Sequence, residues 1–468
     1  MRKHAGILWI IMLLVWLGGW QQGHAAFDLS LAQQISEQLW ERLLLGGPPP
    51  LRVAGESLRS EHLVAQFYTQ RLFWPAWSSA TGLVPQVESL LQALREAEVE
   101  GLRPRDYHLA RVESLRIEVL QSQHPEAPGQ AAKLAQLDLL LTDAMLAYGS
   151  HLLYGRLTPR ASSVMFDTSP ETINLVHVLR QGLETNHLAE VFQSLLPRHA
   201  DYAKLRKALG KYRQTPGSEG RVRQILQNME RWRWLPQELG QRYIMVDVIG
   251  YTLDVMEREQ SVLNMRVVVG KPSWPTPVLS SAMSHVVLSP DWRVPPNIAS
   301  RELLPILRAN PGYLAQNNMR LISGSRIIDP RSVNWSSMST KHFPYSLRQE
   351  PGPRNPLGTV KFLFPNRFQV YLHDTSSRRL FAQTERALSH GCIRVERPTD
   401  LAEYALRGVI SRERVVAGMG QRTSRTVSLA EPLPTYIVYR TVLVKEDGSL
   451  QFRPDIYGYD ERQARETS

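Results

Sequence analysis

Cysteine is nearly absent from this sequence: Cys392 is the single one among 468 residues. One thiol excludes an intramolecular disulfide, so the packing of apolar side chains has to hold the fold together. Proteins that use cysteine for stability outside the cytoplasm use it in pairs. Cys392 is therefore either a buried inert side chain or a reactive group, and its sequence neighbours decide between the two.

Long apolar runs are also scarce. The one candidate, residues 7–20, is shorter than the ~20 residues that span a bilayer as a helix. It follows the basic residues 2–4 and precedes the small residues Gly23 and Ala25, which is the pattern of a cleaved export signal. We expect a signal peptide over residues 1–25 and a periplasmic or cell-envelope location for the rest. Membrane anchoring by an uncleaved signal is the alternative.

Runs of one charge are missing as well. The chain has 55 Lys and Arg against 44 Asp and Glu, a formal net charge of +11, and these residues are scattered. A moderately basic surface suits nucleic acid, anionic lipid or a carboxylate-bearing cell-wall polymer. Export argues against nucleic acid, so we expect no nucleic-acid partner.

Helical periodicity dominates the first half of the chain. Apolar side chains recur at three- and four-residue steps, as in Leu137, Leu140 and Ala144. This half has neither paired carboxylates, metal-ligand spacing nor a phosphate loop, so we predict an all-α scaffold domain over residues 27–213. Residues 214–241 open with a polar, Pro/Gly-rich joint and are expected to form a linker and connecting helix.

The pattern changes to short β-branched strands at residue 242, as in residues 262–269. The strand signal lapses over about 290–356, which we interpret as a lid insertion. We therefore predict a mainly β domain over residues 242–420, followed by a C-terminal hairpin and tail over 421–468. The predicted fold class is α+β.

Two segments of the β domain carry the residues suited to chemistry. Residues 368–373 alternate, which predicts a strand with Tyr371 and His373 on the face opposite to its apolar side chains. Cys392 follows Gly391, which permits a turn whose backbone N–H groups point at a developing oxyanion. A thiol is only a few per cent ionised at neutral pH, so it needs an adjacent imidazole to accept its proton.

The imidazole needs a group that orients it. The Asp374 side chain points away from that of His373 on a strand, so we expect the backbone carbonyl of Asp374 to orient the ring. Arg394 either holds a substrate carboxylate or braces the turn beside Cys392, and we favour bracing. His390 either transfers protons or hydrogen-bonds locally. A zinc site from these side chains would lack a fourth ligand.

This constellation resembles the L,D-transpeptidase family. The family signature is a strand histidine followed, after a short interval, by Ser/Thr-His-Gly-Cys, an apolar residue and Arg or Asn. Here the histidine is His373 and the motif is Ser389-His390-Gly391-Cys392-Ile393-Arg394. The similarity extends to Tyr154-Gly155-Arg156-Leu157 in the helical part and to residues 231–236 at the entry into the β domain. One departure is that no segment resembles the peptidoglycan-binding module of larger relatives.

The resemblance implies an exported cysteine transpeptidase whose catalytic domain covers residues 242–420. Cys392 would be the nucleophile and His373 its base, with Tyr371 lining the donor site. The oxyanion-binding turn would consist of Ser389, His390, Gly391 and Arg394. The partners would be peptidoglycan tetrapeptide stems, as donor and acceptor, and carbapenem-type inhibitors would react at Cys392. No cofactor and no metal are implied.

The resemblance implies 3→3 cross-links between stems but leaves the acceptor open. Water would make the protein an L,D-carboxypeptidase, a lipoprotein lysine an anchoring enzyme, and a free D-amino acid an exchange enzyme. An inactive cell-wall-binding scaffold is the alternative from another class. The intact Cys, His and Arg argue against it.

Overall fold

The computed structural model describes residues 25–46, 49–79, 82–121, 129–157, 166–167 and 173–466. The predicted signal peptide lies outside these ranges except for Ala25. The chain forms two compact units, residues 1–153 with 172–196 and residues 154–171 with 197–468. Within the described ranges no helix combines the length and apolar character needed to cross a membrane.

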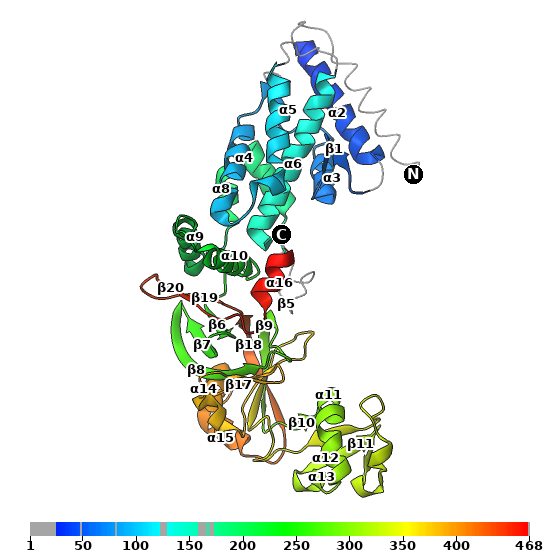
Figure 1. Ribbon diagram of the computed structural model, residues 1–468, viewed down its shortest axis with the longest axis vertical. Helices are drawn as coiled ribbons and strands as arrows, with labels where there is room; N and C mark the ends of the chain where they lie inside the picture. The colour runs from blue at the N-terminus through cyan, green and yellow to red at the C-terminus, as the bar shows by residue number, and fades with distance from the viewer. Residues whose placement is uncertain are drawn as a thin grey trace. The chain divides into compact units, whose positions relative to one another are not determined.

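The first unit is helical, as predicted (Figure 1). Its helices are Ala25–Leu45 (α2), Glu61–Gln70 (α3), Gln86–Arg95 (α4), Leu109–Gln121 (α5), Gln130–Tyr154 (α6, whose last residue falls in the second unit), Leu175–Glu184 (α7) and Leu188–Ser194 (α8). Two short strand pairs accompany them, Arg52–Val53 (β1) with Glu56–Ser57 (β2) and Ser78–Ser79 (β3) with Gly82–Leu83 (β4). Every residue of α6 from Leu137 to Gly149 is buried, so this helix forms the centre of the unit.

Two buried carboxylates on α6 fix the chain that packs around it. Asp138 accepts hydrogen bonds from the Tyr68 hydroxyl at 2.5 Å and from the backbone N–H of Ala76 at 2.8 Å. Asp143 accepts from the N–H of Ser60 at 2.7 Å and contacts His108 Nε2 at 2.8 Å. Buried carboxylates are tolerated only when hydrogen-bonded, so these contacts make α6 a structural element of the unit.

The second unit is mainly β and is built on one sheet that closes on itself. The strand order is β14, β15, β17, β8, β7, β6, β18 and β9, and β9 pairs with β14 again. The strands are Phe166–Asp167 (β5), Arg242–Asp247 (β6), Thr252–Glu257 (β7), Gln260–Gly270 (β8), Val278–Leu288 (β9), Val360–Leu363 (β14), Leu372–His373 (β15), Ala387–Ser389 (β16), Ile393–Val395 (β17) and Arg425–Val438 (β18). Closure leaves few free strand edges and surrounds one apolar core.

Helices α9, α10, α14 and α15 belong to this unit, together with α16 described below. The first four are Ala200–Arg213 (α9), Glu219–Arg233 (α10), Pro398–Ala405 (α14) and Arg412–Met419 (α15). Helices α9 and α10 pack on each other across the short joint that was expected to begin the linker.

The C-terminal residues complete the sheet. Strand β18 lies between β6, to which it is parallel, and β9, to which it is antiparallel. The chain continues as the hairpin Val442–Val444 (β19) and Leu450–Phe452 (β20) and the helix Tyr459–Glu466 (α16). Residues 421–468, which the sequence suggested as a hairpin and tail, thus also supply a strand of the closed sheet.

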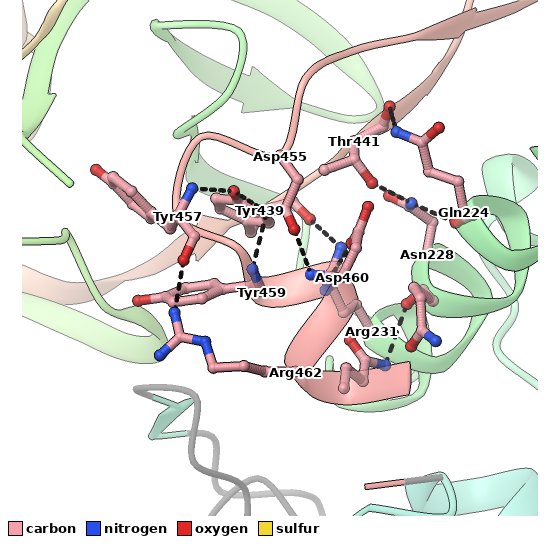
Figure 2. Close-up of polar contacts among 12 residues, drawn as sticks. Gln224, Asn228, Arg231, Tyr439, Thr441, Asp455, Tyr457, Tyr459, Asp460 and Arg462 are labelled. Atoms are coloured by element: carbon pink, nitrogen blue, oxygen red, sulfur yellow. Dashed lines mark hydrogen bonds and ion pairs between the residues drawn. The ribbon is translucent and has the colours of Figure 1, made fainter. Parts of the chain in front are cut away.

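A carboxylate organises the end of this C-terminal segment (Figure 2). Asp455 accepts hydrogen bonds from the Tyr439 hydroxyl at 2.5 Å and from the backbone N–H groups of Tyr459 and Asp460, both at 2.8 Å. Arg231 on α10 then pairs with Asp460 at 2.5 Å. These contacts tie the start of α16 to α10.

The predicted lid is a small subdomain with its own core. Its helical part runs through Pro296–Ile298 (α11), the π-helical turn Ala299–Leu303 (η3), Leu304–Ala309 (α12) and Tyr313–Gln316 (α13). Trp292–Arg293 (β10), Met319–Ser323 (β11), Arg326–Ile328 (β12) and Ser346–Gln349 (β13) form a separate four-stranded sheet. The lapse of the strand signal over about 290–356 therefore does not mean that strands are absent, because strands this short leave little alternation in the sequence.

The strand predicted over residues 368–373 is also shorter than expected, since only Leu372–His373 is extended. Asn366 causes the difference. Its Oδ1 accepts from the backbone N–H of Phe368 and Val370, both at 3.1 Å, which replaces strand pairing by a turn. The left-handed φ of +55° at Gln369 belongs to the same turn.

Candidate active site

Strand register brings the predicted residues together. Strands β15 and β17 are parallel neighbours, with His373 opposite Arg394. Tyr371 and Cys392 precede these two residues by two positions each, so all four side chains belong to one face of the sheet. On the other side of β15, Lys361 of β14 is the antiparallel partner of His373. His373 thus lies in a row between two cations.

The turn that carries Cys392 is shaped by short hydrogen bonds. The Ser389 hydroxyl donates to the carbonyl of Cys392 at 2.6 Å and accepts from the N–H of Gly391 at 3.1 Å. Gly391 has a φ of +108°, which side-chain-bearing residues rarely adopt. Because the N–H of Gly391 is occupied by Ser389, it is not available to an oxyanion, and the N–H of Cys392 is the candidate donor.

Thr276 also supports this turn, and no local sequence pattern indicated this role. Its hydroxyl accepts from the N–H of Gly270 at 2.8 Å and donates to the carbonyl of Gly391 at 2.8 Å, and the side chain is fully buried. Tyr457, from the C-terminal segment, donates to the carbonyl of Gly270 at 2.5 Å and accepts from the N–H of Thr276 at 3.3 Å. The last part of the chain therefore reaches the turn beside Cys392.

The imidazole of His373 is oriented as predicted. Its Nδ1 lies 2.5 Å from the backbone carbonyl of Asp374. A carbonyl only accepts, so Nδ1 carries the proton and Nε2 keeps its lone pair. The Asp374 carboxylate turns away and accepts from the N–H and hydroxyl of Thr359, both at 2.9 Å.

Burial keeps the thiol and the imidazole neutral at rest. It lowers the pKa of His373 to about 3, with further lowering by the charges of Arg394 and Lys361, while the Asp374 carbonyl acts in the opposite sense. Burial also raises the pKa of Cys392 to about 11, against the hydrogen bonds from Tyr371 and the nearby cations. The resting pair is therefore thiol and imidazole, and a thiolate forms only by proton transfer.

Tyr371 lies against both groups. Its hydroxyl hydrogen-bonds to the thiol of Cys392, and its ring meets that of His373 edge-to-face at 5.8 Å between centroids. A phenol at this position donates to the sulfur and stabilises its anionic form. Tyr371 therefore lies directly beside the Cys392 sulfur, whereas the family resemblance implied only that it lines the donor site.

His390 contacts the lid. Its Nε2 lies 2.6 Å from the Glu302 carboxylate in the π-helical turn, and its ring packs edge-to-face on Trp274 at 5.4 Å. Of the two roles considered for His390, the structure provides a local polar contact, and this contact joins the lid to the turn that bears Cys392.

The Arg394 side chain makes no hydrogen bond or ion pair among the described residues, and its buried Nε has no partner. The turn therefore receives its support from Ser389 and Thr276. Across the described ranges no group of three or more His, Cys, Asp or Glu side chains is placed to hold a metal ion.

Two family profiles match the chain. Residues 62–209 match a scaffold domain and residues 241–416 an L,D-transpeptidase catalytic domain. A Haemophilus influenzae protein named "Putative L,D-transpeptidase" is 32% identical over 334 residues, which are 69% of this chain and 66% of that protein. The chain thus spans just under two thirds of the length of this relative.

Solved structures give a weaker likeness. An L,D-transpeptidase from Mycobacterium smegmatis is 13% identical over 42% of this chain and 58% of its own, with a TM-score of 0.19. L,D-transpeptidase 3 from Mycobacterium tuberculosis is 11% identical over 42% and 61%, with a TM-score of 0.21. TM-scores this low carry no argument. The similarities that count are those to the two family profiles and to the H. influenzae protein.

Proposed function

Because the chain belongs to the L,D-transpeptidase family through residues 241–416, we propose that it cross-links peptidoglycan stem peptides through a thioester on Cys392. The observation that carries the proposal is the shared face of Tyr371, His373 and Cys392. On this face the imidazole is fixed by a carbonyl and the thiol is hydrogen-bonded to a phenol. This arrangement supports nucleophilic catalysis by sulfur with a neutral base.

In the first half-reaction the donor is a tetrapeptide stem. The Cys392 thiol gives its proton to Nε2 of His373, and the sulfur attacks the carbonyl between the third residue and the terminal D-Ala. The N–H of Cys392 faces the oxyanion of the tetrahedral intermediate. The intermediate collapses as His373 protonates the leaving amine, so that D-Ala departs and the acyl group stays on sulfur.

In the second half-reaction an amine replaces the sulfur. The side-chain amine on the third residue of another stem attacks the thioester and gives a proton to His373. The proton returns to the departing thiolate, which regenerates Cys392 and leaves a 3→3 peptide bond. Water, a lipoprotein lysine or a free D-amino acid in place of this amine would give the other products considered above.

Purified protein with tetrapeptide stems tests this function. We expect an acyl adduct on Cys392 that lacks D-Ala, followed by a 3→3 dimer, both seen by mass spectrometry. Cys392→Ala should form neither while keeping its thermal midpoint within a few degrees. Free tripeptide without dimer would indicate hydrolysis, and no adduct with stems or with a carbapenem would favour the inactive scaffold.

We also propose that the reaction takes place in the cell envelope, outside the cytoplasmic membrane. The support is the predicted export signal over residues 1–25. Cell fractionation with an antibody against the chain tests this, and a purely cytoplasmic signal would contradict it. The apparent mass of the envelope form would separate a cleaved signal from a retained anchor.

A further inference from the structure

Two cations flank the proposed catalytic base in one row across the sheet. Lys361 on β14 and Arg394 on β17 are the register partners of His373 on its two sides. Register partners share a face, and neighbouring strands lie about 4.8 Å apart. The two cations therefore stand on either side of His373, on the same face as Cys392.

Lys361 has no acidic partner. Among the described residues its side chain makes neither a hydrogen bond nor an ion pair, and its Nζ lies 5.7 Å from the centroid of the Tyr371 ring. The carboxylate that acts most on it is Asp291. That carboxylate is held by Arg348 at 2.9 Å and by Arg293 at 3.9 Å.

Arg394 is in the same situation, as its buried Nε without a partner indicates. Burial lowers the pKa of both Lys361 and Arg394, because removing their positive charges from water is unfavourable. The Cys392 thiol does not balance them at rest, because it is neutral. Partly buried cations without partners are unfavourable, and an anion that arrives with a ligand would balance their charges.

We propose that Lys361 and Arg394 together bind a free carboxylate of the stem peptide beside the bond that is cleaved. The proposal rests on the transpeptidase function and deepens it by naming the group that is recognised. The planar guanidinium of Arg394 offers two parallel donors to a carboxylate, and the ammonium of Lys361 supplies a point charge from the other side of His373. A peptide clamped by its carboxylate between these strands would present its neighbouring amide to Cys392.

Two carboxylates of a stem peptide have this chemistry. One is the C-terminal carboxylate of the leaving D-Ala, and the other is the side-chain carboxylate of a diamino acid at the third position. Tetrapeptides amidated at one or the other position distinguish them. The carboxylate whose amidation weakens binding is the one that the site recognises.

Binding to the Cys392→Ala protein tests the site without any turnover. Calorimetry should give at least tenfold weaker binding for one of the two amidated peptides than for the free acid. Adding Lys361→Met or Arg394→Gln should weaken binding of the acid about tenfold and shrink its preference over that amide. Lys445→Met, on the exposed β19–β20 turn, removes the same charge elsewhere and should leave both affinities unchanged.

Equal binding of acid and amides, no binding of any of them, or an unchanged preference in both variants would overturn the carboxylate site. If Lys361 and Arg394 only stabilise the Cys392 thiolate, the expected result differs. Lys361→Met would then shift the pH profile of Cys392 alkylation by uncharged iodoacetamide, and the preference for the free acid over the amide would stay intact. Carboxylate-selective binding without turnover in the protein that retains Cys392 would instead uphold the site and refute the transpeptidase function.

Discussion

Replacing Thr276 by Val removes one hydroxyl and tests how the turn beside Cys392 is held. The two side chains have nearly the same shape, so the change leaves no large cavity. It strips the N–H of Gly270 and the carbonyl of Gly391 of the partner that each has at 2.8 Å. Both groups are buried, and an orphaned buried group costs about 1–3 kcal/mol.

The expected loss of stability follows from these terms. Two orphaned groups, less about 0.8 kcal/mol for burying a methyl group, give a loss of roughly 1–5 kcal/mol. At about 2 °C per kcal/mol for a unit of this size, the thermal midpoint should fall by about 2–10 °C. The turn should also shift, and a displacement near 1 Å at a nucleophile lowers rates by up to ~100-fold. We therefore expect acylation by a carbapenem to slow roughly 10- to 100-fold.

Thermal unfolding and timed mass spectrometry of the carbapenem adduct measure the two effects on one sample. Thr276→Ser is the matched control, since it keeps the hydroxyl and loses only a methyl group, and it should acylate within about threefold of the parent. A Thr276→Val protein that acylates at the parental rate would refute the view that Thr276 positions the turn. An unchanged midpoint would show that Gly270 and Gly391 find other partners.

Three further outcomes follow from other contacts of the site. Alkylation of Cys392 by iodoacetamide should rise about tenfold per pH unit from pH 6 to 9, because burial raises the thiol pKa to about 11; a rate that levels off near pH 7 would indicate an ion pair instead. Glu302→Gln should change the rate of carbapenem acylation less than about fivefold, because the contact between Glu302 and His390 is partly exposed; a larger change would show that this contact between the lid and the turn is needed for acylation. Tyr457→Phe should lower the thermal midpoint by roughly 2–8 °C in a melting experiment, since it loses its bond to Gly270; an unchanged midpoint would contradict that support.

Local patterns indicated Cys392 as the candidate nucleophile and His373 as its candidate base from the sequence alone. Gly391 before Cys392 marks a turn, and the alternation before His373 indicates that Tyr371 and His373 share a face, although only Leu372–His373 is extended. The direction of the Asp374 side chain follows from the same period of two, which is why the carbonyl contact to His373 could be predicted. Each of these inferences needs only a few consecutive residues.

Lys361, Thr276 and Tyr457 could not be found in this way. Each reaches the site through the register of strands and loops that are distant in the chain, and register depends on the packing of the whole sheet. The helical half was predictable because its periodicity is long. The strands of the lid were not, because each is too short to establish an alternation.

The place of β18 and Tyr457 near the end of the chain has a consequence for the order of synthesis. The ribosome makes Cys392 before it makes the strand that separates β6 from β9 and the phenol that supports Thr276. A nascent or prematurely terminated chain therefore contains the Cys392 thiol but lacks β18 and also Tyr457, which supports the turn around it. Chains that stop between Cys392 and Tyr457 are therefore expected to carry the thiol without the hydrogen bonds that position Thr276 and the turn beside it.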